Sequence, residues 1–242
     1  MMLRKVLFLI MTIIILVGVS GCMDSKKHLS SQEKEAKVLE YLKNKYDEEF
    51  VPLSISQSGW GQGYDVILLY PKNGSKDDYF EVNGSLRKDG SYFITDGYFK
   101  RIIYDEYEAV LSDIVDDIYK DFKVYVDFGT GVCNENLKKG TKIEEIYDID
   151  KNFSSYTKII VKESSLTGKD ISESLENIAK KMKGNKLVGT VKIYLAYNNM
   201  FDFADLKKTN ELPDDVKDIF MQGSRKYIDV DSELEISEVE NG

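Results

Sequence analysis

The chain has 242 residues, of which 42% are hydrophobic and 12% are aromatic, a composition too apolar for a disordered polymer. Its formal net charge of −9 would repel the phosphates of DNA or RNA, which excludes a nucleic acid as partner. It has only two cysteines, Cys22 and Cys133, so the fold cannot rest on a framework of disulfides.

The N-terminus has the features of a secretion signal that ends in a lipid anchor. Arg4 and Lys5 precede an apolar run, Val6 to Val19, which is shorter than the ~20 apolar residues that a membrane-spanning helix needs. The tetrapeptide Val19-Ser20-Gly21-Cys22 follows and resembles the lipobox of bacterial lipoproteins. In that family the cysteine thiol takes a diacylglycerol and the chain is cleaved just before it.

The resemblance implies a signal peptide over residues 1–21, a lipid on Cys22 and a protein anchored on the extracytoplasmic face of the cell membrane. The alternative is an ordinary signal peptide with a chance cysteine. The mature chain would carry a formal charge of −11, because the signal removes two of the 33 basic residues and none of the 42 acidic ones. Residues 22–30 lack apolar periodicity and predict a tether.

The body is predicted to be α+β, with an N-terminal helix, an antiparallel meander and a helix, followed by a second α+β half. Two modules are expected, residues 31–128 and residues 129–242. In the first, Ser30 and Glu33 form a capping box that opens a helix over residues 31–48. Four β-rich runs separated by turn residues follow: Val51–Ser56, Tyr64–Tyr70, Tyr79–Val82 and Ser91–Ile94.

A second helix then has one apolar face, formed by Tyr107, Val110, Leu111, Ile114, Ile118 and Phe122, and leads into a strand over Lys123–Phe128. In the second module, Asp170 caps a helix that Gly184 ends. The other expected elements are a turn of helix near residues 143–147, strands over Tyr156–Lys162, Leu187–Tyr197 and Tyr227–Ile236, and a short helix from Pro213 to Gly223.

One pattern in the first module resembles a module of Gram-positive surface lipoproteins of unassigned function. It consists of Tyr41-Leu42-x-x-Lys45-Tyr46-x-x-Glu49-Phe50, an aromatic-glycine turn, Phe80-x-Val82 and Asp96-Gly97-Tyr98 before an acidic helix. The resemblance covers residues 34–122. It implies a membrane-tethered accessory or binding protein and supplies no catalytic residues.

Two acidic runs have some features of a metal site. Asp148-x-Asp150-x-Asn152 resembles the start of a calcium loop, but Phe153 and Ile159 stand where glycine and glutamate are needed, which excludes an EF-hand. The acidic residues of 229–235 alternate with apolar ones, as in a strand with one buried face. No metal ligand and no cofactor is therefore predicted.

The turn Gly59-Trp60-Gly61-Gln62-Gly63-Tyr64 is the candidate contact with a partner. Its glycines leave the only tryptophan, Trp60, without neighbouring side chains, so Trp60 and Tyr64 could stack on a sugar ring or on a partner's side chain. In the alternative interpretation, Trp60 folds back on the sheet.

No catalytic residues are predicted. The only histidine, His28, lies in the tether, so Cys133 has no base and is expected to be a half-buried apolar residue in a loop. The predicted function is a non-enzymatic binding or accessory lipoprotein, held on the membrane by Cys22, with an envelope protein or glycan as partner. The alternative is an envelope glycan hydrolase that uses Asp or Glu residues.

Overall fold

The computed structural model describes residues 29–59, 63–166, 168–205, 218–221 and 226–239. The predicted signal, Cys22 and Trp60 lie outside these residues, as does most of the helix expected from Pro213 to Gly223. The described part of that helix, residues 218–221, is not helical, because it forms a turn and then an antiparallel bridge between Phe220 and Ala196. Within the described part of the chain, no helix is both long and apolar enough to cross a membrane.

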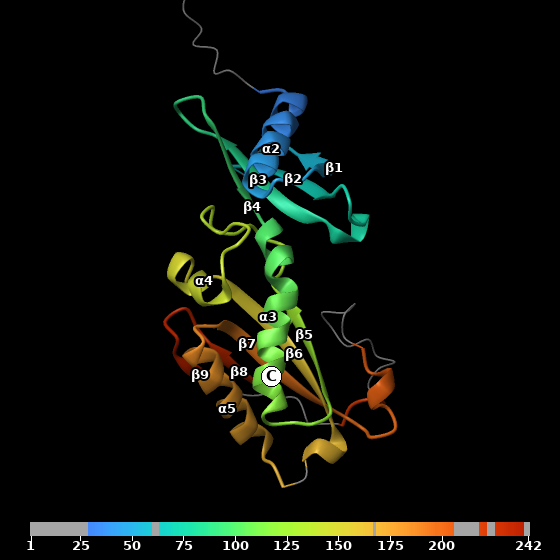
Figure 1. Cartoon of the computed structure of the whole chain (residues 1–242). Coiled ribbons are helices and arrows are strands. Elements are labelled where there is room, and N and C mark those ends of the chain that lie inside the picture. Colours follow the sequence, from blue (N-terminus) through green and yellow to red (C-terminus); the bar gives the residue numbers. More distant parts are fainter. Residues whose placement is uncertain (1–28, 60–62, 167, 206–217, 222–225, 240–242) are drawn as a thin grey trace, which may run out of the picture.

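Two sheets and the helices that pack on them make up the fold, which confirms the predicted α+β class (Figure 1). The first sheet has the order β1 (Phe50–Ser56), β2 (Asp65–Pro71), β3 (Phe80–Leu86), β4 (Tyr92–Asp96). The second has the order β5 (Phe122–Asp127), β6 (Ser154–Lys162), β7 (Val188–Ala196), β8 (Lys226–Val230), β9 (Ile236–Val239). All pairs are antiparallel except β6 with β7.

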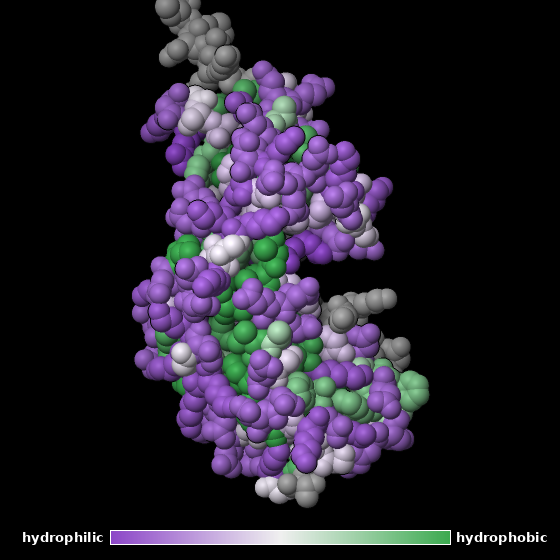
Figure 2. All heavy atoms as spheres, in the orientation of Figure 1, coloured by the Kyte–Doolittle hydropathy of each residue, from purple (hydrophilic) through white to green (hydrophobic). Residues whose placement is uncertain are grey.

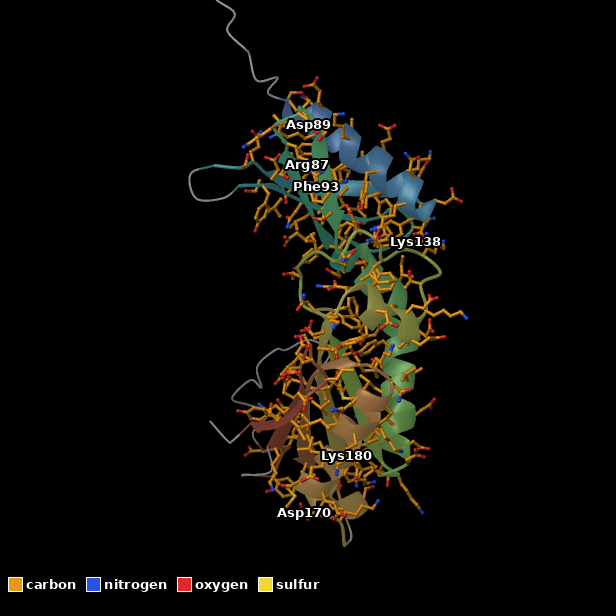
Figure 3. All side chains as sticks on the ribbon, turned by 90° about the vertical axis from the view of Figure 1, so that its left-hand side faces the viewer. Arg87, Asp89, Phe93, Lys138, Asp170 and Lys180 are labelled. Carbon is orange, nitrogen blue, oxygen red and sulfur yellow. The ribbon has the colours of Figure 1, made fainter. Side chains whose placement is uncertain are left out.

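The α-helices are α2 (Ser31–Tyr46), α3 (Tyr98–Asp116), α4 (Ile143–Ile149) and α5 (Ile171–Gly184), and the 3-10 helices are η1 (Lys76–Asp78), η2 (Glu163–Leu166) and η3 (Phe201–Phe203). The predicted capping box begins α2, since the Ser30 hydroxyl accepts from the Glu33 amide and the Glu33 carboxylate accepts from the Ser30 amide at 2.7 Å. Asp170 caps α5 at the end of the molecule remote from the meander (Figure 3).

The four strands of the meander fall on the four β-rich runs predicted from the sequence, although β3 continues past Val82 to Leu86. At the β3–β4 turn, the Asp89 carboxylate accepts from the Ser91 amide at 2.9 Å, and the Arg87 guanidinium lies 3.9 Å from the centre of the Phe93 ring (Figure 3). Within the sheet, Tyr92 lies over Gly84, where a Cβ atom would meet the Tyr92 hydroxyl at 2.1 Å. A glycine is needed there because the tyrosine crosses it to reach a carboxylate of β2.

Helix α3 connects the two sheets, running from the meander down one face of the second sheet (Figure 1). Tyr98 packs in a core with α2 and the meander, whereas Phe99 and Ile103 pack in the larger core of the second sheet. The hydrophobic core therefore changes within the first turn of α3. The division into modules 31–128 and 129–242 stays a prediction.

The helix predicted over residues 31–48 ends at Tyr46, because Asp47 takes a left-handed conformation with φ +56°. Two other expectations about the ends of elements were wrong. The apolar face predicted for the second helix reached Phe122, but α3 ends at Asp116 and Phe122 begins β5. The strand predicted over Tyr227–Ile236 is a hairpin of β8 and β9. In its turn the Asp231 carboxylate accepts the amides of Glu233 and Glu235, and Leu234 has φ +59°. The apolar periodicity continued through both breaks, so it gave no sign of them.

Candidate functional site

One face of the second sheet is covered by α3 and α5 (Figure 1). On the opposite face a small hydrophobic cluster that includes Ile160, Tyr194 and Phe220 covers part of β6 and β7, and polar and aromatic side chains lie towards the end of β5. On β5, Val124 and Val126 point into the core, so Tyr125 and Asp127 point to the opposite face. The neighbouring strand β6 places Tyr156 and Lys158 there, as the partners of Asp127 and Tyr125. These four side chains form the floor of the candidate site.

A cleft of about 810 Å³ lies above this floor, between the second sheet, the first turns of α3 and the segment that joins η1 to β3. Figure 2 shows the molecule hollowed on the right, below the part that holds the meander. Six aromatic side chains line the cleft: Tyr79, Phe80, Tyr104, Tyr125, Phe128 and Tyr156. Its volume lies within the range of about 300–1,000 Å³ that is usual for ligand sites.

A second hollow of about 550 Å³ adjoins the cleft. The two share Asp127, Phe128, Gly129 and Tyr156. The second hollow extends towards the β8–β9 hairpin, where the Thr190 hydroxyl donates to the Asp229 carboxylate at 2.7 Å. The two hollows therefore lie side by side across the second sheet, at the end of the sheet where β5 terminates.

Lys158 is the buried cation of the floor, with 4% of its surface exposed. Its ammonium nitrogen lies 5.7 Å from the centre of the Tyr156 ring. Burial lowers the pKa of Lys158, the Asp127 carboxylate opposes this shift, and Lys192, its register partner on β7, adds to it. Lys158 thus places a partly desolvated positive charge against the cleft.

An ion pair forms part of the wall of the cleft. The Arg101 guanidinium of α3 donates to the Asp78 carboxylate of η1 at 2.5 Å. Nearby, the Lys100 ammonium donates to the Gly131 carbonyl at 2.9 Å, and the Tyr104 hydroxyl donates to Glu108 at 2.8 Å. Cationic and acidic side chains therefore stand side by side along the wall.

A buried carboxylate, Asp96, holds this wall in place. It accepts from the hydroxyls of Tyr46 at 2.6 Å and Tyr41 at 3.0 Å, from the Lys45 ammonium at 2.9 Å, and from the Tyr98 amide at 3.0 Å. Burial and the nearby Asp96 carboxylate raise the pKa of both tyrosines. The network joins α2 and β4 to the start of α3.

Cys133 lies in a loop as predicted, but it is buried rather than half-buried. Its amide donates to the Asp96 carbonyl at 2.8 Å, and burial raises the pKa of its thiol to about 12. A thiol with so high a pKa is not a nucleophile at neutral pH.

The other residues singled out from the sequence do not meet in the cleft. Tyr64 has 43% of its surface exposed and precedes β2, whereas η1 follows β2, so the two lie at opposite ends of that strand. The Asp148 carboxylate pairs with the Lys186 ammonium at 2.8 Å. Among the described residues, no three His, Cys, Asp or Glu side chains are arranged to hold a metal ion.

The sequence interpretation missed the residues of the cleft. A signal was present in the alternation of strands β5 and β6, since Tyr125, Asp127, Tyr156 and Lys158 all occupy the outward positions. Aromatic and charged residues on the same face of two neighbouring strands indicate a face that is neither core nor plain solvent-exposed surface.

No family model matches this chain, and no curated protein matches it. Among solved structures, the chain is similar to the crystal structure of a DUF5037 family protein from Ruminococcus gnavus, with 16% sequence identity and a TM-score of 0.39. The likeness covers 81% of this chain and 90% of that one.

Proposed function

We propose that the protein is a membrane-anchored extracytoplasmic lipoprotein whose body binds an envelope ligand without transforming it. The observation that carries the binding role is the cleft between the two sheets, with its aromatic rings, its buried Lys158 and its mixed charges. Large concave sites with a few convergent polar groups are the usual place for a ligand.

Binding is favoured over catalysis by the chemistry of the candidate nucleophiles and bases. The chain's only histidine, His28, lies before the described residues, so the cleft as described has no imidazole base. The Cys133 thiol is buried with a raised pKa. The hydrolase alternative would need Asp127, the carboxylate of the floor, and one of the carboxylates of the wall to stand on opposite sides of a scissile bond.

The expected lipid anchor supports the proposed location on the extracytoplasmic face of the membrane. Two acyl chains on Cys22 would hold the protein on the membrane, because each buried methylene contributes about 0.8 kcal/mol and one chain alone gives only marginal binding. The apolar run of the signal is too short to replace them.

The lipid anchor and the membrane location are tested by growing cells with a clickable palmitate analogue. Cys22→Ser should abolish the label and leave uncleaved precursor or shed protein. Cys133→Ser is the matched control, and it should keep the label. Label on the Cys22→Ser protein would contradict the lipoprotein assignment.

The binding role is tested by co-sedimentation of the mature chain, carrying Cys22→Ser, with purified envelopes. Lys158→Met should lower the bound fraction several-fold, because it removes the buried charge of the floor and keeps a side chain of similar length. Release of reducing sugar from the envelopes, lost in Asp127→Asn, would replace the binding function by the hydrolase.

A further inference from the structure

We infer that the cleft binds an oligosaccharide, with sugar rings stacked on its tyrosines and sugar hydroxyls hydrogen-bonded to the charged groups between them. This inference rests on the proposed binding function and names the ligand class of the same site. It goes beyond the sequence interpretation, which left protein and glycan open and placed the contact at Trp60 and Tyr64.

The cleft offers several aromatic faces on which a sugar ring can stack. Tyr79 on the wall has 47% of its surface exposed, while Tyr125 and Tyr156 on the floor are half-buried beneath the cleft. A half-buried tyrosine is fixed by its packing and offers a rigid apolar surface at low entropic cost. The C–H faces of a sugar ring are apolar and flat, and they match such a surface.

The cleft also carries charged side chains of both signs. The lining includes three cations, Lys100, Arg101 and Lys158, and five carboxylates, Asp77, Asp78, Glu81, Asp105 and Asp127. A polyanion would meet more carboxylates than cations, and a polycation would meet the buried ammonium group of the floor. A hydroxyl both donates and accepts, so a polyhydroxylated ligand can use both kinds of side chain.

The floor of the cleft is formed by the face of the second sheet. A ligand in the cleft meets the side chains of β5 and β6 on the face of the sheet. Strand addition, the common way in which a sheet binds a peptide, would use the free edge of β5, the outer strand of this sheet, and would not reach Tyr156 and Lys158 on the inner strand β6. The adjoining hollow, which shares Asp127 and Tyr156, extends the surface beyond the room of one ring.

The test is calorimetric titration of the mature chain, carrying Cys22→Ser, with chitotetraose, cellotetraose and neutral oligosaccharides released from the host's own envelope. Poly(glycerol phosphate) and tetralysine are the anionic and cationic comparisons. We expect at least one neutral oligosaccharide to bind more tightly than either charged polymer. Tyr79→Ala should weaken that binding about threefold to tenfold, because one stacking surface is lost.

Tyr197→Ala is the matched control, since Tyr197 is also exposed, at 38%, and does not line the cleft; it should bind like the parent. Tighter binding of a charged polymer, or no binding of any neutral oligosaccharide, would overturn the sugar class. The proposed binding function would survive that result if Lys158→Met still reduced envelope co-sedimentation. Oligosaccharide binding lost in Tyr64→Ala but kept in Tyr79→Ala would overturn the cleft as its site.

Discussion

At the scale of single residues, Gly189 shows how strictly the floor of the second hollow is built. Its φ is +145°, and a Cβ atom there would lie 2.1 Å from the Ser155 carbonyl oxygen on the neighbouring strand. A side chain would therefore suffer both backbone strain and a collision with a backbone atom that cannot move without breaking the β6–β7 pairing.

We expect Gly189→Ala to lower the free energy of unfolding by about 3 kcal/mol or more. Gly184→Ala is the matched control, because a Cβ atom at the end of α5 has nothing within 4 Å and alanine favours the helix by about 0.5–1 kcal/mol. Urea denaturation measures both. Equal stability of the two variants would contradict the described backbone at Gly189.

The ionisation of a buried tyrosine affects the stability of the fold at high pH. Burial raises the pKa of Tyr107 to about 12, although a hydrogen bond with Ser155 partly offsets the shift. A raised folded-state pKa contributes stability that is complete below the unfolded value of about 10 and is lost as the pH rises towards 12.

The unfolding free energy should therefore fall above pH 10, by about 1.4 kcal/mol per pH unit for each such tyrosine. Tyr107→Phe should cost about 1 kcal/mol at neutral pH through its lost hydrogen bond. Because only the parent loses stability through the titration of Tyr107, the two curves should meet at about pH 11, and the variant should be the more stable protein above that pH. Guanidinium denaturation at pH 8, 10 and 11 checks this. Parallel curves for the two proteins would contradict the raised pKa.

At the scale of elements, α2 is joined to the meander by two ion pairs that are largely shielded from water. Lys34 pairs with Asp65 and Lys45 with Asp96, each at 2.9 Å. Burial opposes ionisation of Asp65, but donors from Ser58, Lys34 and Tyr92 outweigh it and lower its pKa. Such pairs fix the position of the helix, because a buried charge without its partner is costly.

We expect Lys45→Met to lower the free energy of unfolding by about 3 kcal/mol, since it leaves the buried Asp96 carboxylate without its cation. The exposed pair of Lys72 and Glu49 supplies the matched control, and Lys72→Met should leave the denaturation midpoint unchanged. Equal loss in both variants would show that burial of the Asp96 pair does not matter.

At the scale of the whole molecule, the sequence predicts those features of the fold that depend on a few adjacent residues. Ser30 with Glu33 marked the start of α2, and Asp170 marked that of α5. The β8–β9 turn escaped notice because the apolar residues on both sides of Asp231 kept their spacing, while the turn depends on hydrogen bonds of one carboxylate.

The cleft could not be predicted because it depends on residues far apart in the chain. Alternation places Tyr156 and Lys158 on one face of β6, but it does not say what lies opposite. That is decided by α3, which carries Arg101 from the end of the meander to the edge of the second sheet, and by η1, which brings Asp78 to meet it. The pattern of residues along a strand shows which side chains share a face of the sheet. It does not show how two sheets are placed relative to each other, and that placement forms the cleft.

The most direct test of the account is photo-crosslinking of the anchored protein in living cells. A benzophenone amino acid replaces Tyr79 in the cleft, Tyr64 at the opposite end of β2, or Tyr197 outside the cleft, all of which are exposed. The account predicts a ligand adduct from position 79 and none from position 197. An adduct from position 64 or 197, with none from position 79, would contradict the cleft as the binding site.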